Sequence, residues 1–138
     1  MSFNRAFEIV LGHEGGYSAD PHDPGGETKF GISKRAYPQL DIKALTIEQA
    51  RDIYFKDYWL AAGCGYIADE SMAILVFDCA VNQGVSKANN IAGKAKTLSE
   101  FQAERALHYA SLPTFGRFGR GWMRRLFNVL LQATGEKT

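Results

Sequence analysis

The sequence predicts one mainly α-helical (α+β) domain with a small irregular element near its N-terminus. Apolar residues recur at the three- and four-residue spacing of a helix face in several stretches. Two capping-box motifs, each an N-cap threonine followed three residues later by Gln or Glu, mark helix starts. Between Gly12 and Ser33, by contrast, glycine, proline and acidic residues are too frequent for a helix and indicate a loop or a small β-hairpin.

The N-terminal part of the chain is predicted to hold two helices on either side of this irregular segment. Apolar spacing gives a helix from Phe3 to His13, which Gly15 helps to end. The loop or hairpin follows over residues 17–30. Residues 31–37 are interpreted as a short helix that ends before Pro38, because proline cannot continue a helix.

Four helices are predicted in the rest of the chain. Two of them open with the capping boxes, at Thr46 and at Thr97. The helix that begins at Asp69 is apolar nearly all round, which predicts a central, buried element ended by Gly84. The expected spans are 46–62, 69–81, 97–112 and 119–133.

Overall charge excludes some classes of partner. The net charge is +1, which gives no basis for nucleic-acid binding. No apolar stretch has transmembrane length, so stable membrane insertion is not expected. The chain shows no secretory signal, so we expect synthesis in the cytoplasm and assisted export, and we expect a monomer. Four arginines gather near the C-terminus, either as a solvated helix face or as a basic end for an anionic polymer: Arg117, Arg120, Arg124 and Arg125.

Cysteine and histidine positions give no case for a bound metal. Cys64 and Cys79 form no CxxC pair and lie in apolar surroundings, so buried free thiols are expected. His13 and His22 flank acidic residues, but their spacing fits no common metal motif. We therefore expect neither metal nor cofactor.

The irregular segment carries the candidate chemistry. Glu14 closes the first predicted helix, where the negative end of the helix dipole favours a neutral, proton-donating carboxyl group. Asp23 and Thr28 follow on a glycine-rich segment that can fold back to face it. Two carboxyl groups across a sugar-sized gap are the minimum apparatus for glycoside hydrolysis, and a hydroxyl group can hold the attacking water. Taken singly, each of these residues also suits a helix boundary or a turn.

Other residues are candidates for substrate contact. Tyr17 and Tyr58 could stack on sugar rings or pack in the hairpin and the core. The amide of Asn82 could bind an N-acetyl group or cap a helix end. Trp59 is expected in the core, and Asp78, inside an apolar helix, needs a buried hydrogen-bond partner rather than a substrate.

The motif H-E-G-G-Y followed by D-P-x-D-P-G-G-x-T-x-x-G-I, from residue 13 to residue 32, resembles the glycoside hydrolase family 108 lysozymes. These are N-acetylmuramidases of phages and some bacterial genomes. The segments YFKDYW, FDCAVNQG and LPTFGRFGRGW resemble the family less tightly. The resemblance implies a lysozyme-like fold with helices around a cleft, Glu14 as general acid, and Asp23 on the water side. The Asp23–Thr28 separation is one residue shorter than it can be in phage-type lysozymes.

The resemblance also implies a function. It predicts a single catalytic domain over 1–138 that hydrolyses the β-1,4 bond between N-acetylmuramic acid and N-acetylglucosamine of peptidoglycan. A phage endolysin reaching the periplasm through a holin-made lesion would fit. A lytic transglycosylase and a non-catalytic peptidoglycan-binding protein are the alternatives. The segment 84–98 is short, so the peptidoglycan-binding-like helical part, about 72–138, is expected to be reduced.

Overall fold

The computed structural model describes residues 2–19 and 26–135. Within these ranges the chain is mainly helical, with one two-stranded antiparallel sheet, as predicted. The first part of the chain forms α1 (Ser2–His13), β1 (Thr28–Lys29), β2 (Ile32–Ser33) and α2 (Ile47–Tyr54). A π-helix (Phe55–Leu60) and a 3-10 turn (Cys64–Tyr66) follow. The remaining helices are α3 (Glu70–Gln83), α4 (Val85–Ala92), α5 (Leu98–Ser111) and α6 (Phe115–Thr134).

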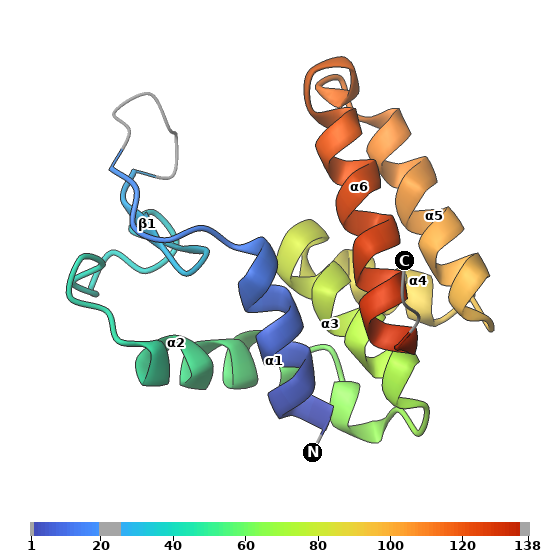
Figure 1. Cartoon of the computed structure of the whole chain (residues 1–138), viewed down its shortest axis with the longest axis horizontal. Helices are drawn as coiled ribbons and strands as arrows, with labels where there is room; N and C mark the ends of the chain where they lie inside the picture. Colours follow the sequence, from blue (N-terminus) through green and yellow to red (C-terminus); the bar gives the residue numbers. More distant parts are fainter. Residues whose placement is uncertain (1, 20–25, 136–138) are drawn as a thin grey trace.

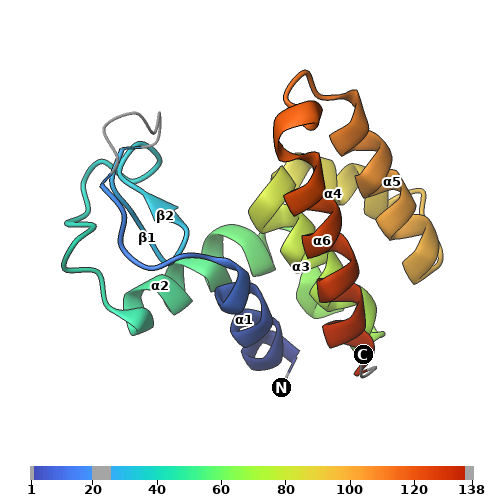
Figure 2. The same cartoon turned by 45° about the horizontal axis from the view of Figure 1, so that its top comes forward.

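Helix α3 is the centre of the molecule. It packs against α1, α4, α5 and α6, and it also contacts the π-helix. Helices α5 and α6 lie side by side, and the β1–β2 hairpin lies on the opposite side of α1 from them (Figures 1 and 2). In the part of the chain that the structure describes, the irregular segment and α6 are separate parts of the fold, and they come together at the end of α1, where Glu14 contacts Arg125.

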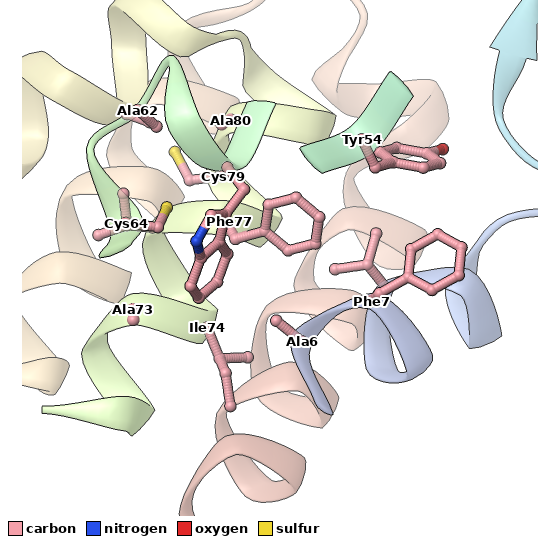
Figure 3. Packing of buried hydrophobic residues seen from close by; sticks show 14 of the residues in the cluster. Ala6, Phe7, Tyr54, Ala62, Cys64, Ala73, Ile74, Phe77, Cys79 and Ala80 are labelled. Atoms are coloured by element: carbon pink, nitrogen blue, oxygen red, sulfur yellow. The ribbon is translucent and has the colours of Figure 1, made fainter. Parts of the chain in front are cut away.

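The core is built around α3 because that helix is apolar on nearly every face. All its residues from Ala73 to Ala80 are buried. Figure 3 shows Phe77 in the middle of the cluster, with Phe7 and Tyr54 toward one side and Cys64 toward the other.

Both cysteines are buried and unpaired, as predicted. Burial is the main reason that the pKa of the Cys64 thiol rises to about 12 and that of Cys79 to about 11. Both groups are therefore protonated at neutral pH and behave as small apolar side chains.

Three predicted helix starts, at Thr46, Asp69 and Thr97, are confirmed by their caps. The Thr46 and Thr97 hydroxyl groups each accept a hydrogen bond from the backbone N–H three residues on, and both capping boxes are complete. Asp69 accepts from the N–H of Ser71. Gly84 ends α3 with a φ of 100°, a conformation that favours glycine.

The short helix predicted over residues 31–37 is wrong. Phe30 and Gly31 form the two-residue connection of the hairpin, and Ile32 pairs with Lys29 across it. Both connecting residues have positive φ, 54° and 79°, as the tight hairpin turn of right-handed twist demands. Residues after Ser33 then make isolated turns, with the Tyr37 N–H donating to the Ser33 carbonyl.

The helix predicted over 46–62 is α-helical only as far as Tyr54. From Phe55 it continues as a π-helix, in which hydrogen bonds join residues five apart. Tyr54 and Trp59 are five apart and both buried, at 1% and 5% exposure. Residues at that spacing do not share a face of an α-helix, so the wider turn lets both rings enter the core.

Two helices in the C-terminal part also differ from the prediction. Helix α4 was not predicted, although its buried Ala88 and Ile91 lie at helical spacing. Helix α6 begins at Phe115 rather than at Gly119, because the glycines at its start conceal the pattern. Among the described helices, none combines the length and apolarity that crossing a membrane requires.

Candidate active site

Glu14 stands at the junction between α1, the hairpin and α6. It directly follows the last residue of α1, and its backbone N–H still donates to the Leu11 carbonyl at 3.2 Å. Its side chain is 19% exposed, so the carboxyl group is mostly enclosed yet open to solvent at one face. Two unrelated sets of contacts hold it, one from the hairpin and one from the helices.

The hairpin is tied to the chain that follows Glu14. The N–H and C=O groups of Ser18 and Thr28 exchange two hydrogen bonds of 2.8 Å. The Phe30 N–H donates to the Gly15 carbonyl at 3.1 Å. The backbone beyond α1 therefore runs antiparallel along β1, and this pairing brings the hairpin connection next to the Glu14 side chain.

Gly31 makes the approach of the carboxyl group sterically feasible. A Cβ atom at this position would lie 2.9 Å from Glu14 Oε2 and 2.5 Å from the Tyr54 hydroxyl oxygen, closer than such atoms pack. The Tyr54 hydroxyl donates to the Phe30 carbonyl at 2.5 Å, which ties the hairpin connection to the end of α2. Burial, followed by the nearby charge of Glu14, raises the pKa of Tyr54, so this hydroxyl stays protonated and donating.

The second set of contacts is ionic and comes from α6. Arg125 Nη1 lies 2.9 Å from Glu14 Oε1. The Nε and Nη2 atoms of the same guanidinium donate to Asp78 Oδ1 at 3.1 and 2.9 Å. Asp78 is fully buried in α3, and its other oxygen lies 2.8 Å from Arg105 Nη2 of α5. Four charges therefore alternate in sign from Glu14 through Arg125 and Asp78 to Arg105.

This alternation keeps Asp78, Arg105 and Arg125 ionised despite burial. Burial by itself disfavours the Asp78 carboxylate, but Arg105 and Arg125 outweigh it and lower the pKa of Asp78. Burial likewise disfavours the Arg125 cation, and the carboxylates of Asp78 and Glu14 reverse the effect and raise its pKa. Arg125 is therefore a permanent cation that contacts the side chains of both Asp78 and Glu14.

At the buried end of this series of charges, glutamine side chains accept hydrogen bonds from Arg105. Arg105 Nε donates to Gln83 Oε1 at 2.6 Å, and Arg105 Nη1 donates to Gln102 Oε1 at 3.3 Å. The Gln102 amide in turn donates to the Leu126 carbonyl at 2.8 Å, which joins α5 to α6. Within the described ranges, no buried side-chain nitrogen or oxygen lacks a partner. The network is fully bonded, so it holds Arg125 in one orientation.

Comparison with known proteins identifies the family. The family model described as Glycosyl hydrolase 108 matches residues 7–84, more than half of the chain. The chain belongs to the glycosyl hydrolase 108 family. This GH108 chain is also similar in structure to SagA of Brucella abortus, with a TM-score of 0.83 and 26% sequence identity. The likeness covers 96% of this chain and 94% of the other. No curated protein sequence matched.

Membership in GH108 implies a glycoside hydrolase of the peptidoglycan-cleaving type, and the fold is lysozyme-like. The matched segment contains Glu14, the hairpin, Tyr54 and Asp78. It does not contain Arg105 or Arg125, which come from α5 and α6. The family match and the ionic contacts of Glu14 therefore draw on different parts of the GH108 chain.

The structure describes two of the three predicted catalytic residues, Glu14 and Thr28. Glu14 is held as described above. Thr28 lies on β1, two residues before the connection that contacts Glu14, and its backbone is bonded to Ser18. Asp23 lies outside the described residues, so its predicted role stays a prediction. Among the side chains that are described, no group of three acidic, histidine or cysteine residues is placed to hold a metal.

The predicted substrate-contacting residues lie in three places. Tyr17 is exposed, and its hydroxyl donates to Glu27 at 2.5 Å. Tyr58 lies half-buried on the π-helix, with its ring centre 5.5 Å from that of Tyr54. Asn82, near the end of α3, accepts a hydrogen bond from the Tyr109 hydroxyl. Trp59 and Asp78 are in the core with their partners, as predicted.

Sequence reasoning missed Arg125 as part of the site. Its position in a group with three other arginines suggested either a solvated helix face or a basic end for an anionic polymer, but the structure leaves only 12% of its side chain exposed. The apolar residues of α6 carried a usable signal. Leu126 and Val129 define the buried face, and Arg125 lies four residues before Val129, which places it beside that face rather than opposite to it.

Proposed function

We propose that the chain is a muramidase that hydrolyses the β-1,4 bond between N-acetylmuramic acid and N-acetylglucosamine, with Glu14 as the general acid. The position of Glu14 carries the proposal. Its carboxyl group is partly exposed. It packs closely against Gly31 on one side and is hydrogen-bonded to Arg125 on the other. A general acid must be kept in one orientation relative to the bond that it protonates, and rigid contacts on two sides meet this need.

The proposed chemistry follows from this orientation. The Glu14 proton passes to the glycosidic oxygen as the bond from that oxygen to the anomeric carbon breaks. The sugar ring then carries an oxocarbenium-like positive charge, which a water molecule quenches at the anomeric carbon while losing a proton. Glu14, now a carboxylate beside Arg125, regains a proton from solvent before the next cycle.

Arg125 acts in this proposal as a positioning residue. Its hydrogen bond to Glu14 Oε1 restricts the orientation of the carboxyl group. Asp78 contacts the same guanidinium, which fixes the orientation of Arg125 toward Glu14.

We propose that Asp23 and Thr28 hold or activate the attacking water. Their order in the sequence after Glu14 supports this role. Their presence distinguishes two related reactions, hydrolysis and lytic transglycosylation. A hydrolase needs a group that activates or holds water, whereas a lytic transglycosylase needs only the acid and closes the muramic acid on itself. The presence of both residues after Glu14 favours hydrolysis.

The decisive experiment is a digest of purified peptidoglycan with the wild type and with Glu14→Gln. Glutamine preserves the shape of the side chain and can still accept from Arg125, but it has no proton to donate at the required acidity. We expect the wild type to release products that end in reducible N-acetylmuramic acid, read by mass spectrometry after borohydride reduction. The variant should retain its thermal unfolding temperature and lose at least about 100-fold in rate.

The other outcomes would redirect the assignment. Products ending in anhydro-muramic acid would make the chain a transglycosylase. Retained activity in Glu14→Gln would remove Glu14 from the catalytic role. Binding to the cell wall without cleavage by the wild type would favour the non-catalytic alternative.

A further inference from the structure

A polar pocket lies next to the Glu14–Arg125 pair. Its volume is about 310 Å³, and it opens between the end of α1, the end of α3 and the middle of α6. His13, which immediately precedes Glu14, and Arg125, which contacts Glu14, both line it. The remaining walls come from Asn82, Gly121, Trp122, Arg124 and Asn128. The pocket therefore adjoins the proposed catalytic carboxyl group.

The pocket is cationic and rich in hydrogen-bond donors. No carboxylate is among its lining residues. The charge of Arg125 is met by Asp78 and Glu14, but Arg124 is exposed and has no ion-pair partner among the residues that the structure describes. Because Asn82 uses its oxygen to accept from Tyr109, its NH₂ group remains as a donor.

The walls of the pocket are fixed in place. The Trp122 ring stacks on the Tyr109 ring with their centres 4.8 Å apart and their planes at 18°. The His13 imidazole is hydrogen-bonded to the Gln132 side chain at 2.8 Å. Arg125 is held by the network described above. A ligand therefore meets a preformed site in which Arg124 is the adaptable charged group.

We propose that this pocket binds a carboxylate of the peptide stem of peptidoglycan, with Arg124 as its principal ligand. The inference rests on the proposed function and deepens it. N-acetylmuramic acid carries its peptide on the lactyl group, close to the bond that is cut, and the stem bears free carboxylates. A guanidinium matches a carboxylate with two parallel hydrogen bonds, and the amides of Asn82 and Asn128 supply neutral donors nearby.

The chemistry of the lining distinguishes this ligand from the glycan itself. N-acetyl and hydroxyl groups are neutral, and aromatic faces and amides satisfy them. Arg124 places a second guanidinium beside that of Arg125, so an anionic group gains more attraction from this pocket than a neutral group does. The recognised group is therefore the anionic part of the substrate.

The test compares two substrates that differ only in the peptide. One is intact peptidoglycan, and the other is the same glycan after a muramoyl-alanine amidase has removed its stems. Arg124→Gln is compared with Arg117→Gln, which makes the same charge change at an exposed position of α6 outside this pocket. We expect Arg124→Gln to lower kcat/KM about tenfold or more on intact peptidoglycan and to match the wild type on stripped glycan. Arg117→Gln should match the wild type on both.

Several results would overturn the proposal. Equal losses on both substrates would assign the pocket to the glycan. An equal loss in Arg117→Gln would reduce the effect to general attraction between the basic helix and an anionic wall. Unchanged activity in Arg124→Gln would remove the site.

A binding measurement separates this proposal from the catalytic one. Calorimetric titration with a soluble disaccharide-peptide and with the bare disaccharide requires no cleavage. If the wild type cuts neither polymer, the proposed function fails. A peptide-dependent affinity that Arg124→Gln lowers would still support the pocket, and its absence would refute it.

Discussion

The two sides that hold Glu14 are built on opposite physical principles. On the hairpin side, a missing side chain at Gly31 and one neutral hydrogen bond from Tyr54 let the backbone approach the carboxyl group. On the helical side, full charges from α3, α5 and α6 reach it through Arg125. The first side is steric and local, and the second is electrostatic and joins residues 111 apart in the chain.

This difference separates what each side contributes. A close steric contact fixes the position of a group, so a change there displaces that group directly as well as straining the fold. A buried ionic network links the helices, and breaking one partner leaves a charge without compensation. Damage to the hairpin side should therefore appear first in the rate, and damage to the helical side first in the free energy of unfolding.

The largest expected effect is that of Asp78→Asn. The substitution leaves two buried guanidinium groups facing a neutral amide, and we expect a loss of about 3–5 kcal/mol in the free energy of unfolding. Urea denaturation measures it. Asp52→Asn, the same change at an exposed position of α2, is the control and should stay within about 0.5 kcal/mol of the wild type. Equal stability of Asp78→Asn and wild type would contradict the ionic account.

The pH dependence of stability sharpens the same test. The pKa of Asp78 is lowered in the folded protein, so its stabilising contribution is present above its unfolded value of about 3.9 and is lost as the pH falls through the folded value. The wild type should therefore lose stability in acid below about pH 4. In Asp78→Asn this part of the acid loss should vanish.

Gly31→Ala is expected to act mainly on the rate. Its methyl group would press on Glu14 and on the Tyr54 hydroxyl, and alanine resists the positive φ, so we expect a loss of about 2–4 kcal/mol in stability. Displacing the carboxyl group by about 1 Å should lower kcat/KM about 100-fold at temperatures where the variant is folded. Gly16→Ala is the control, because its added methyl group meets nothing within 4 Å. Full activity in Gly31→Ala would refute the steric role.

Tyr54→Phe should have the smallest effect on stability. It removes the donor to the Phe30 carbonyl but keeps the buried ring, so we expect a loss of about 1–2 kcal/mol. Thermal unfolding measures the change in stability, and peptidoglycan digestion measures the change in kcat. We expect a measurable fall in kcat, because the hairpin connection then loses its hydrogen bond to α2. A loss of stability with unchanged kcat would confine Tyr54 to packing.

Local signals in the sequence predicted most of the helices. Threonine caps, Asp69 and Gly84 act on their own neighbours, so their effects could be read without knowing the fold. The hairpin connection at Phe30 was missed, because phenylalanine is unusual at positive φ and only tertiary contact holds it there. The π-helix was missed for a similar reason, since Trp59 enters the core only where the rest of the core can accept it.

The site was predictable on one side only. Glu14 could be found from its place at a helix end before glycines, and the need of Asp78 for a partner followed from its apolar neighbours. The identity of that partner could not be read, because Arg105 and Arg125 meet Asp78 only after three helices have packed. Charge pairing over such separations depends on the fold rather than on local pattern.

Gly84 ends the stretch that matches the family and also turns the chain directly from α3 into α4. A cut at this glycine would separate the carboxylates Glu14 and Asp78 from both arginines that neutralise them. Exchange of the C-terminal portion between relatives at this point would therefore yield a working enzyme only if the incoming segment delivered guanidinium groups to the same two places. Evolution of the last three helices is constrained by the acid at the end of the first.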